Sequence, residues 1–412
     1  MTPVPAANNY AERFRQNIAR GVLATLDTIP DDESLLCEDV KARALRVLDH
    51  ALKVDEAWTG TRDLLLVMAP KMEQAGHRGD WLLRLEDAVK HSRNLDDRTT
   101  AAELGMQIGN LYYRLSQFDK ATRWLTFSLE GFEEQNNLSG QCIILNRLAL
   151  VACREEKFQY AAKLALQALD NLKTTELEQA NSHYVLGEVA RARNMWQKAE
   201  SHFRHSLKLW EERGSKREIA RGLRNLGPAL RKQEKYTEAI NCYERALSLF
   251  AQIDDPVNQA KTQTNLGIIY SICDRLYDAL KLFRAAEKVF SNAHDHLNLA
   301  KVYINMGINY RKLGEYKQSE ETYLAGINIW HQLGNIRSLC NAMDGLGLTY
   351  LSLNRYNKAI CEFNKALDKL VIIKDEPYYH KLREMLLMHI KQARLEQKKS
   401  EHYSFVLDHS TE

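Results

Sequence analysis

Small and bulky side chains recur along the chain with a regular period of about 40 residues, which is within the range of known helical repeats. The small residues stand at Gly109, Ala149, Gly187, Gly227, Gly267, Gly307 and Gly347, with successive spacings of 40, 38, 40, 40, 40 and 40. A second small residue lies twelve residues after each of these. A bulky residue stands three residues before the second small residue, and a third small residue stands seven residues after it, as in Tyr236, Ala239 and Ala246. Small residues at these intervals let two helices approach closely, and the bulky residue fills the gap at their turn. Each copy is therefore predicted to be a hairpin of two α-helices, a helix A followed by a helix B.

The repeats cover most of the chain. A degenerate first copy is expected at residues 61–98, where Ala69, Trp81 and Ala88 stand one period before their counterparts. Seven further copies complete a repeat array over residues 61–375. Because such hairpins bury their apolar faces by stacking on their neighbours, the pattern predicts an all-α solenoid.

The two ends do not follow the repeat. In residues 1–60, two amphipathic helices are expected at 6–28 and 38–54, and their predicted role is to cover one end of the stack. Residues 376–397 are predicted to form a capping helix at the other end, and residues 398–412 a flexible tail. The apolar residues expected on one side of the capping helix are Leu382, Leu386, Leu387 and Ile390.

The repeat resembles the tetratricopeptide repeat. Helix A carries Leu-Gly-x-x-x-Tyr, as in Leu266-Gly267 to Tyr270, and helix B carries Ala-x-x-x-Tyr/Phe-x-x-Ala-Leu, as in Ala239 to Leu247. The resemblance implies a right-handed superhelix of about eight hairpins with capping helices. Since the period is longer than that of the usual tetratricopeptide repeat, the helices are expected to be longer. The longer variant is similar to arrays in bacterial signalling ATPases and in eukaryotic adaptor proteins.

Composition narrows the class of protein. Of 412 residues, 45% are hydrophobic and 27% are charged, with 57 Lys and Arg against 54 Asp and Glu, which excludes a disordered chain. No apolar run approaches the roughly 18–20 residues of a membrane-spanning helix, and residues 1–20 contain no apolar segment typical of an export signal. The seven cysteines stand singly, which is typical of reduced thiols. We therefore expect a cytoplasmic protein with no membrane contact.

Catalytic motifs are absent from the sequence. There is no GxxxxGK[ST], GxSxG or HExxH, and Gly345-Leu346-Gly347 is best explained by helix packing. His202 and His205 lie three residues apart on a predicted helix B, but Phe203 takes the core position, so both imidazoles are expected to face solvent. No cysteine or carboxylate completes a metal geometry there. We expect no enzyme activity, no cofactor and no metal.

One face of helix A is basic. When the small residue of each copy is numbered 8 and each residue advances 100°, positions 2, 5, 6, 9, 12 and 13 lie opposite the apolar face. The tetratricopeptide resemblance places this arc on the inner, concave side. Through the third to seventh copies its basic residues are Arg147, Arg154, Arg191, Arg221, Arg224, Arg231, Lys232, Lys261, Lys301, Arg311 and Lys312. Its one acidic residue in those copies is Glu188.

Two positions of this arc form ladders. Arg221, Lys261 and Lys301 share one position in successive copies, and Asn225, Asn265 and Asn305 share another. Asparagine amides both donate and accept hydrogen bonds, so the second ladder suits the backbone of an extended peptide. The first two copies carry Asp63, Glu73 and Glu103 instead, and the groove is expected to become more positive toward its C-terminal half.

Three interpretations of the basic arc remain. It is a solvated helix face, a groove for an acidic segment of a protein or peptide, or a nucleic-acid site. We favour the second, since Arg and Lys engage carboxylates, whereas nucleic acid is disfavoured because few aromatic residues are interleaved with the basic ones. The predicted function is a non-catalytic scaffold or regulatory adaptor, whose partners include an effector enzyme that it regulates. The alternative is a receptor for a signalling peptide that switches the conformation of the superhelix.

Overall fold

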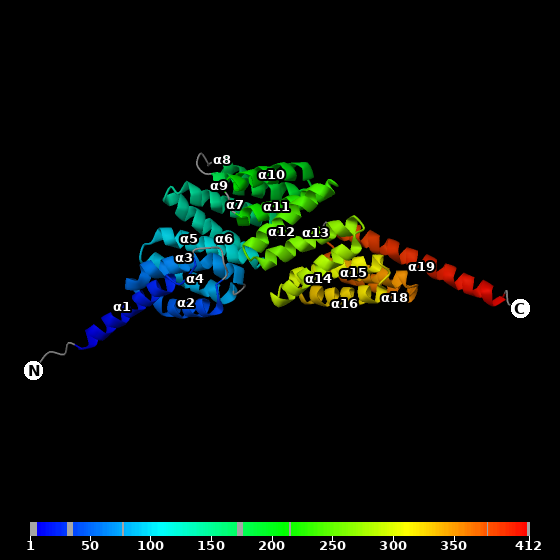
Figure 1. The fold of residues 1–412 in the computed structure, drawn as a ribbon, viewed down its shortest axis with the longest axis horizontal. Coiled ribbons are helices and arrows are strands. Elements are labelled where there is room, and N and C mark those ends of the chain that lie inside the picture. Colours follow the sequence, from blue (N-terminus) through cyan, green and yellow to red (C-terminus); the bar gives the residue numbers. More distant parts are fainter. Residues whose placement is uncertain are drawn as a thin grey trace, which may run out of the picture. The chain divides into compact units, whose positions relative to one another are not determined.

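The computed structural model describes residues 6–30, 36–75, 78–170, 176–213, 216–376 and 378–409. Within these ranges the regular structure consists of nineteen α-helices and two short 3-10 helices with no strand, and the α-helices follow one another as hairpin pairs (Figure 1). The expected all-α solenoid is confirmed.

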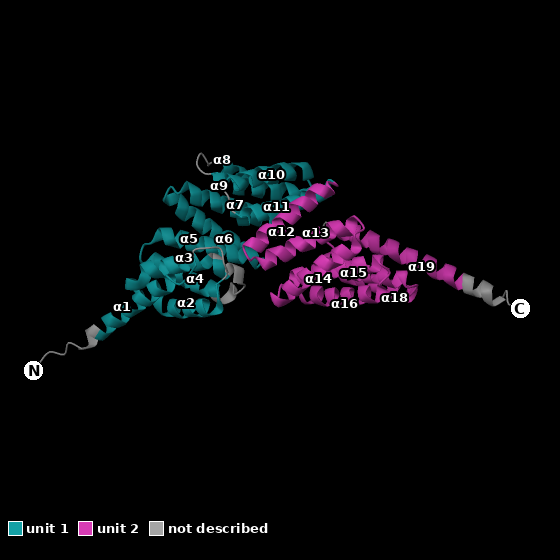
Figure 2. Ribbon diagram, in the orientation of Figure 1, with its two compact units in different colours: residues 1–233 teal, residues 234–412 magenta. Residues whose placement is uncertain are grey.

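The chain forms two compact units, residues 1–233 and 234–412 (Figure 2). Unit 1 contains α1 (Ala6–Leu26), α2 (Glu38–Ala51), η1 (Asp55–Ala57), α3 (Trp58–Ala75), α4 (Arg78–Asn94), α5 (Arg98–Arg114), α6 (Phe118–Glu134), α7 (Leu138–Arg154), α8 (Phe158–Asp170), α9 (Glu176–Ala192), α10 (Trp196–Arg213) and α11 (Lys216–Lys232). Unit 2 contains α12 (Tyr236–Gln252), α13 (Pro256–Ile272), α14 (Leu276–Asn292), α15 (His296–Lys312), α16 (Tyr316–Gln332), α17 (Ile336–Ser352), α18 (Tyr356–Leu370), η2 (Val371–Ile373) and α19 (Tyr379–His409).

Helices of equal length and short turns produce the period. Both α13 and α14 have 17 residues, and three residues follow each of them before the next helix begins. The turns contain residues with positive φ that end the preceding helix, such as Asp274 at 60° and Gly314 at 78°. Helix α15 then begins at a capping residue, because the Asp295 side chain accepts a hydrogen bond from the Asn298 backbone N–H at 3.2 Å. Two 17-residue helices and two turns of three residues therefore make up the 40-residue period.

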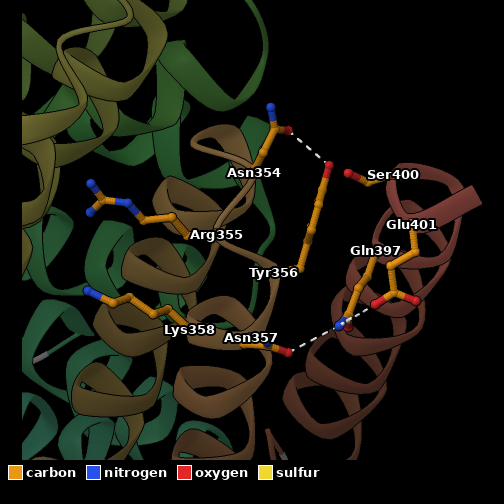
Figure 3. Close-up of a pocket in the computed structure, with 8 residues that line it drawn as sticks. All are labelled: Asn354, Arg355, Tyr356, Asn357, Lys358, Gln397, Ser400 and Glu401. Atoms are coloured by element: carbon orange, nitrogen blue, oxygen red, sulfur yellow. Dashed lines mark hydrogen bonds between the residues drawn. The ribbon is translucent and has the colours of Figure 1, made fainter. Parts of the chain in front are cut away.

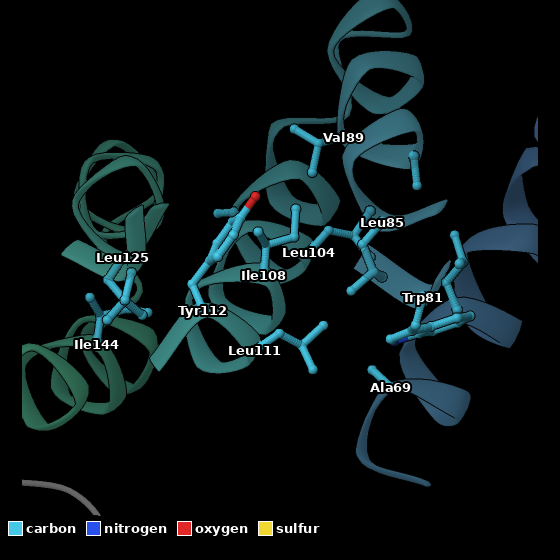
Figure 4. Packing of buried hydrophobic residues seen from close by; sticks show 14 of the residues in the cluster. Ala69, Trp81, Leu85, Val89, Leu104, Ile108, Leu111, Tyr112, Leu125 and Ile144 are labelled. Atoms are coloured by element: carbon cyan, nitrogen blue, oxygen red, sulfur yellow. The ribbon is translucent and has the colours of Figure 1, made fainter. Parts of the chain in front are cut away.

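The core of unit 1 continues from one hairpin to the next. Figure 4 shows Trp81 and Leu85 of α4 beside Leu104 and Ile108 of α5, all of them buried. Trp81, the expected bulky residue of the degenerate first copy, is 1% exposed. Each fully buried side chain of this size contributes about 1.5–3 kcal/mol. The stack therefore depends on contacts that cross the hairpin boundaries.

The recurring small residue is required by close helix packing. In unit 2, Phe283 of α14 is fully buried and lies against Gly267 of α13. A Cβ atom at Gly267 would lie 2.6 Å from Cε1 of Phe283, which is closer than real Cβ contacts. The glycine of the pattern therefore leaves room for an aromatic ring of the second helix.

The helices outside the repeats pack on the ends of the two units. In unit 1, α1 packs against α2 and α3. In unit 2, α19 packs against α18 and α17, and it buries Leu382, Leu386, Ile390 and Ala393. Leu387 was expected on the packing face but is 40% exposed. The reason is that α19 has neighbours on one side only and buries a narrow stripe of its surface. The helix also continues through residues 398–409 of the segment expected to be a flexible tail, while residues 410–412 lie outside the described ranges.

Candidate ligand-binding surface

The A helices of unit 1 pack against one another in series. Contacts join α3 to α5, α5 to α7, and α7 to α9. The tetratricopeptide resemblance predicts that the first helices of successive hairpins line the inner side of the stack. We call the surface that they and α11 present there the inner surface of unit 1. It is defined by Tyr113, Arg114, Arg147, Arg154, Tyr184, Glu188, Arg191, Arg221 and Arg224.

Tyr184 of α9 stands at the centre of this surface. Its ring is half-buried against Trp210 and Phe203, with centroid separations of 5.9 and 6.1 Å. The Cζ atom of Arg221 lies 5.8 Å from the ring centroid, within the range of a cation–π interaction. Burial raises the pKa of Tyr184, Glu188 adds to that rise, and together they outweigh the opposing charge of Arg221.

Two arginines near Tyr184 repel a third. Burial, together with the charges of Arg147 and Arg221, lowers the pKa of Arg114 to about 10. Burial and the charge of Arg221 also lower the pKa of Arg147. Both Arg114 and Arg147 nevertheless expose part of their surface to solvent. A side chain that is surrounded by protein but still reached by solvent is typical of a concave surface. An anion bound there would relieve the repulsion among Arg114, Arg147 and Arg221.

Two other arginines of this surface form hydrogen bonds within unit 1. Arg191 donates from Nε to Oε1 of Glu188 at 3.1 Å and from Nη2 to Oε2 at 2.7 Å. Arg154 donates from Nε to the Tyr113 hydroxyl at 3.1 Å. These bonds orient the two side chains and leave Glu188 with both oxygens engaged.

The arginine cluster is the feature that the structure adds to the sequence. It consists of Arg114, Arg147, Arg191, Arg221 and Arg224, all of which interact electrostatically with Tyr184. Arg114 and Tyr113 occupy positions 13 and 12 of the second copy, and Tyr184 occupies position 5 of the fourth. The position rule was applied to basic residues of the third to seventh copies only, so it missed these three. Extended to the second copy and to aromatic residues, it would have found them.

Two acidic residues of the first two copies, Asp63 and Glu103, interact with Arg62, which is not part of the arginine cluster. Asp63 accepts a hydrogen bond from Nε of Arg62 at 2.9 Å. Burial raises the pKa of Glu103, while Arg62 opposes that rise. The side chain of Glu73 lies outside the described residues. Since Arg114 of the second copy belongs to the arginine cluster, the positive region begins one copy earlier than the sequence suggested.

In unit 2, several predicted donors have partners nearby. Lys301 Nζ donates to Oδ1 of Asn298 at 3.4 Å, and the amide of Asn305 donates to the carbonyl of Lys301 at 3.0 Å. Lys312 Nζ donates to the carbonyl of Ser271 at 3.0 Å. Burial raises the pKa of Tyr323 to about 12, while the charge of Arg311 opposes that rise. Part of the hydrogen-bonding capacity of Lys301, Asn305 and Lys312 is therefore used within unit 2.

The remaining predicted residues are spread over several helices. Lys232 places Nζ 5.8 Å from the centroid of the Trp196 ring. The half-buried ones are Asn225, Arg231, Lys261 and Asn265. Arg221 belongs to unit 1, whereas Lys261 and Lys301 belong to unit 2. The ladder of these three cations therefore stays a prediction.

The histidines of the fourth hairpin differ from expectation. His202 is half-buried, and its Nδ1 lies 3.3 Å from Nδ1 of His183, a residue that the sequence pattern had not brought into consideration. Burial, with the charges of His205 and His202, lowers the pKa of His183 to about 4. The interpretation that both His202 and His205 face solvent is wrong for His202, because α9 covers it. Across the described ranges, no group of three or more His, Cys, Asp or Glu side chains is arranged to hold a metal ion.

A shallow cavity of about 410 Å³ lies between the start of α18 and α19 (Figure 3). The Tyr356 hydroxyl donates to Oδ1 of Asn354 at 3.0 Å. Gln397 of α19 donates to Oδ1 of Asn357 at 3.2 Å and to Oε1 of Glu401 at 3.1 Å. The polar groups in this cavity thus bond mainly to one another, and the cavity holds none of the predicted site residues.

Comparison with known families decides what kind of repeat this is. A tetratricopeptide repeat model matches residues 178–252, 258–332 and 310–370. The chain therefore carries tetratricopeptide repeats. The matched model describes a repeat and indicates no catalytic family. None of the curated protein sequences matches the chain.

Solved structures share the tetratricopeptide fold at low sequence identity. The signal transduction ATPase with tetratricopeptide repeat sensor PH0952 of Pyrococcus horikoshii has a TM-score of 0.60 at 14% identity, covering 99% of this chain and 67% of its own. Aspartyl phosphate phosphatase F of Bacillus subtilis has a TM-score of 0.54 at 12% identity, and the match covers 91% of this chain and 97% of the phosphatase chain. A Rap protein complexed with Competence and Sporulation Factor has a TM-score of 0.54 at 12% identity, and the match covers 81% of this chain and 99% of the Rap chain. At these identities the likeness shows the fold alone.

Over the part of the chain that the structure describes, no helix combines the length and the hydropathy that crossing a bilayer requires.

Proposed function

We propose that this protein is a non-catalytic scaffold or regulatory adaptor that binds an acidic, extended segment of a partner protein or peptide on the inner surface of unit 1. The observation that carries the proposal is the arginine cluster around Tyr184, in which Glu188 is the neighbouring carboxylate and is already engaged by Arg191. Repeat arrays of this kind present extended surfaces suited to extended ligands. An effector enzyme that the protein regulates is one such partner.

The chemistry of the cluster suits carboxylates. Guanidinium groups donate two parallel hydrogen bonds to a carboxylate, and such bonds are stronger than those between neutral groups. The lowered pKa values of Arg114 and Arg147 mean that the unliganded surface disfavours its own charge. Carboxylates of a bound segment would offset this repulsion, so that binding and electrostatic relief occur together.

The comparisons support a binding role at the level of fold. A Rap protein with the same fold has been crystallised with Competence and Sporulation Factor. The matched family is a repeat family. Both findings agree with a protein that works by holding another molecule.

Affinity capture with matched variants tests the proposal. We expect the unmodified chain to retain partners that contain acidic segments, and the variant Arg147→Glu/Arg221→Glu to lose them. The control Arg93→Glu/Arg123→Glu changes two exposed arginines of helices α4 and α6 and makes the same change in net charge. Retention of the same partners by both variants, with unchanged circular dichroism, would refute the proposed surface.

The cation ladder needs a separate variant because its residues belong to both units. Reversing the charge of Arg221, Lys261 and Lys301 together should weaken binding of the captured partner more than Arg221→Glu alone. Equal affinities of the two variants would restrict the binding surface to unit 1.

Nucleic acid is separated from an acidic polypeptide by competition. Poly-glutamate should displace the captured partner, and a single-stranded oligonucleotide at the same charge concentration should not. Displacement by the oligonucleotide alone would favour the nucleic-acid interpretation instead.

A receptor for a signalling peptide is the second candidate. The division of the chain into two compact units favours it, since two units can respond to a ligand as separate bodies. Small-angle scattering with and without the captured ligand distinguishes the candidates: a fixed adaptor keeps its radius of gyration, and a switch changes it.

A further inference from the structure

Three histidines from two helices converge in the fourth hairpin. His183 belongs to α9, whereas His202 and His205 belong to α10. The ring centroid of His183 lies 5.5 Å from that of His202 and 4.1 Å from that of His205. His205 is exposed, and the other two side chains are half-buried. The cluster is therefore partly enclosed by protein but still open to a small ion from solvent.

Close packing of α9 on α10 sets the register of this cluster. Gly187 stands one turn after His183, and a Cβ atom there would lie 2.7 Å from Cδ1 of Phe203. The glycine thus lets the two helices approach closely beside Phe203, and His202 immediately precedes that residue. In this register Nδ1 of His183 lies 3.3 Å from Nδ1 of His202.

The separation of the two nitrogens matches that of two ligands on one zinc ion. An N–H···O hydrogen bond usually spans about 2.7–3.2 Å, so 3.3 Å is long for a direct bond between the rings. With Zn–N bonds of about 2.0–2.1 Å, the same separation gives an N–Zn–N angle of about 104–111°, which is that of a tetrahedral ion. Square-planar or octahedral ions hold adjacent ligands near 90°, which would need a separation of about 2.9 Å.

The protonation state of the two rings also suits a metal ion. Burial, together with the charges of His205 and His202, lowers the pKa of His183 to about 4, and burial likewise lowers the pKa of His202. Both rings are therefore neutral at pH 7, which is the form in which imidazole binds metals. One Nδ1 carries a proton when the two nitrogens bond to each other. That proton moves to Nε2 of the same ring when an ion takes its place, and the charge of the ring does not change.

We propose that Nδ1 of His183 and Nδ1 of His202 bind a Zn²⁺ ion. Across the residues that the structure describes, no third His, Cys, Asp or Glu side chain completes the set of ligands. Two of the four tetrahedral positions are therefore left to water or to a group of a bound partner. The sequence-based expectation of no metal considered His202 with His205, and it lacked His183 because that residue comes from the other helix of the hairpin.

The visible absorption of cobalt tests the site in the full chain. Co²⁺ replaces Zn²⁺ in tetrahedral sites, and tetrahedral Co²⁺ absorbs much more strongly than octahedral Co²⁺. After treatment with a chelator, we expect the unmodified chain to give the tetrahedral spectrum at one Co²⁺ per chain, and Zn²⁺ to abolish it. Thiolate ligands would add a strong band in the near ultraviolet, which we do not expect.

Two single substitutions and a matched control locate the ion. His183→Gln and His202→Gln should each weaken Zn²⁺ binding by at least about tenfold, because loss of even an outer partner of a ligand costs about 10–100-fold in affinity. Glutamine suits the first position, since Gln263 occupies it in a later copy. The control His294→Asn/His296→Gln removes two exposed histidines whose ring centroids lie 6.3 Å apart, and it should leave the affinity unchanged.

Chemical modification gives a measurement that needs no substitution. Diethyl pyrocarbonate modifies histidine rings that have a free nitrogen lone pair, and mass spectrometry locates the modified residues. Zn²⁺ should protect His183 and His202 and leave the modification of His294 and His296 unchanged. This measurement decides the question even if both substitutions prevent folding.

The outcomes leave no intermediate case. An octahedral Co²⁺ spectrum, or the absence of any spectrum, would overturn the tetrahedral site. Unchanged Zn²⁺ affinity in His183→Gln or in His202→Gln, with unchanged circular dichroism, would overturn it as well, since the ion would then bind elsewhere. Failure to protect the two rings from diethyl pyrocarbonate would have the same meaning. None of these results bears on the inner surface of unit 1, because neither histidine belongs to it.

Discussion

The bond between the terminal helix and the last repeat allows a quantitative test of how α19 is held. Nδ1 of His389 on α19 lies 2.6 Å from Oδ1 of Asp344 on α17, and the two side chains are 12% and 8% exposed. Because an ionised carboxylate only accepts hydrogen bonds, the ring N–H donates. The His389 ring also lies 5.5 Å from that of Phe363. The side chain therefore contributes both a hydrogen bond and a ring contact.

The two contributions are separated by two substitutions. His389→Phe keeps a ring beside Phe363 but removes the donor, so it should cost the roughly 1.5–3 kcal/mol of a hydrogen bond to a charged group. That corresponds to a fall of about 10- to 150-fold in the equilibrium constant for docking α19. His389→Ala also removes the ring contact and should cost about 0.5–1.5 kcal/mol more.

Amide hydrogen exchange of peptides from residues 382–393 measures this effect. Exchange is preferable to a global denaturation curve because repeat arrays open in parts. The control Lys399→Ala breaks an exposed ion pair to Glu396 at 2.9 Å and should change protection little. If His389→Phe leaves the exchange rates of α19 unchanged, the Asp344 bond does not hold the helix and the reasoning is refuted.

Three further predictions concern stability. Gly267→Ala should lower the melting temperature, because overpacking against Phe283 costs about 1–3 kcal/mol and outweighs the roughly 1 kcal/mol gain in helix propensity; a more stable variant would contradict the packing argument. The folded chain keeps His183 neutral down to a pKa of about 4, whereas the unfolded chain takes up that proton near pH 6.5, so stability should fall between pH 7 and 5. In His183→Gln this fall, measured as the shift in melting temperature between the two pH values, should be smaller. Arg147→Gln should raise the melting temperature at pH 7, since its surroundings and the charge of Arg221 disfavour the charged guanidinium in the folded state, and Arg123→Gln should not.

The sequence predicted the helices because their packing is local and repeated. Tyr236 begins α12, and the small residues Ala239 and Ala246 are both fully buried in the structure. A small residue at a helix contact is required wherever two helices approach closely, so its period reports the hairpin directly. The same argument failed at Leu387, because a terminal helix lacks the second neighbour that would cover that side.

The candidate site was predictable only in part. Counting positions along helix A predicts that Arg147 and Arg221 point away from the apolar faces of their helices, but it gives only the direction of a side chain within its own helix. Whether residues 74 positions apart interact depends on how successive hairpins rotate, which a one-dimensional pattern does not contain. Arg114 and Tyr184 also occupy positions of this arc, and they were missed because the rule was applied only to basic residues of the third to seventh copies.

The turns between the helices have a consequence for engineering. Ten non-glycine residues in the described ranges adopt positive φ, among them Glu156 at 61° and Glu234 at 60°, and such residues cost roughly 1–2 kcal/mol where they carry a Cβ atom. Glycine already serves the same purpose at Gly314 and Gly334. The array thus contains a reserve of thermostability that glycine substitutions at the junctions could recover, leaving every ligand-facing side chain as it is.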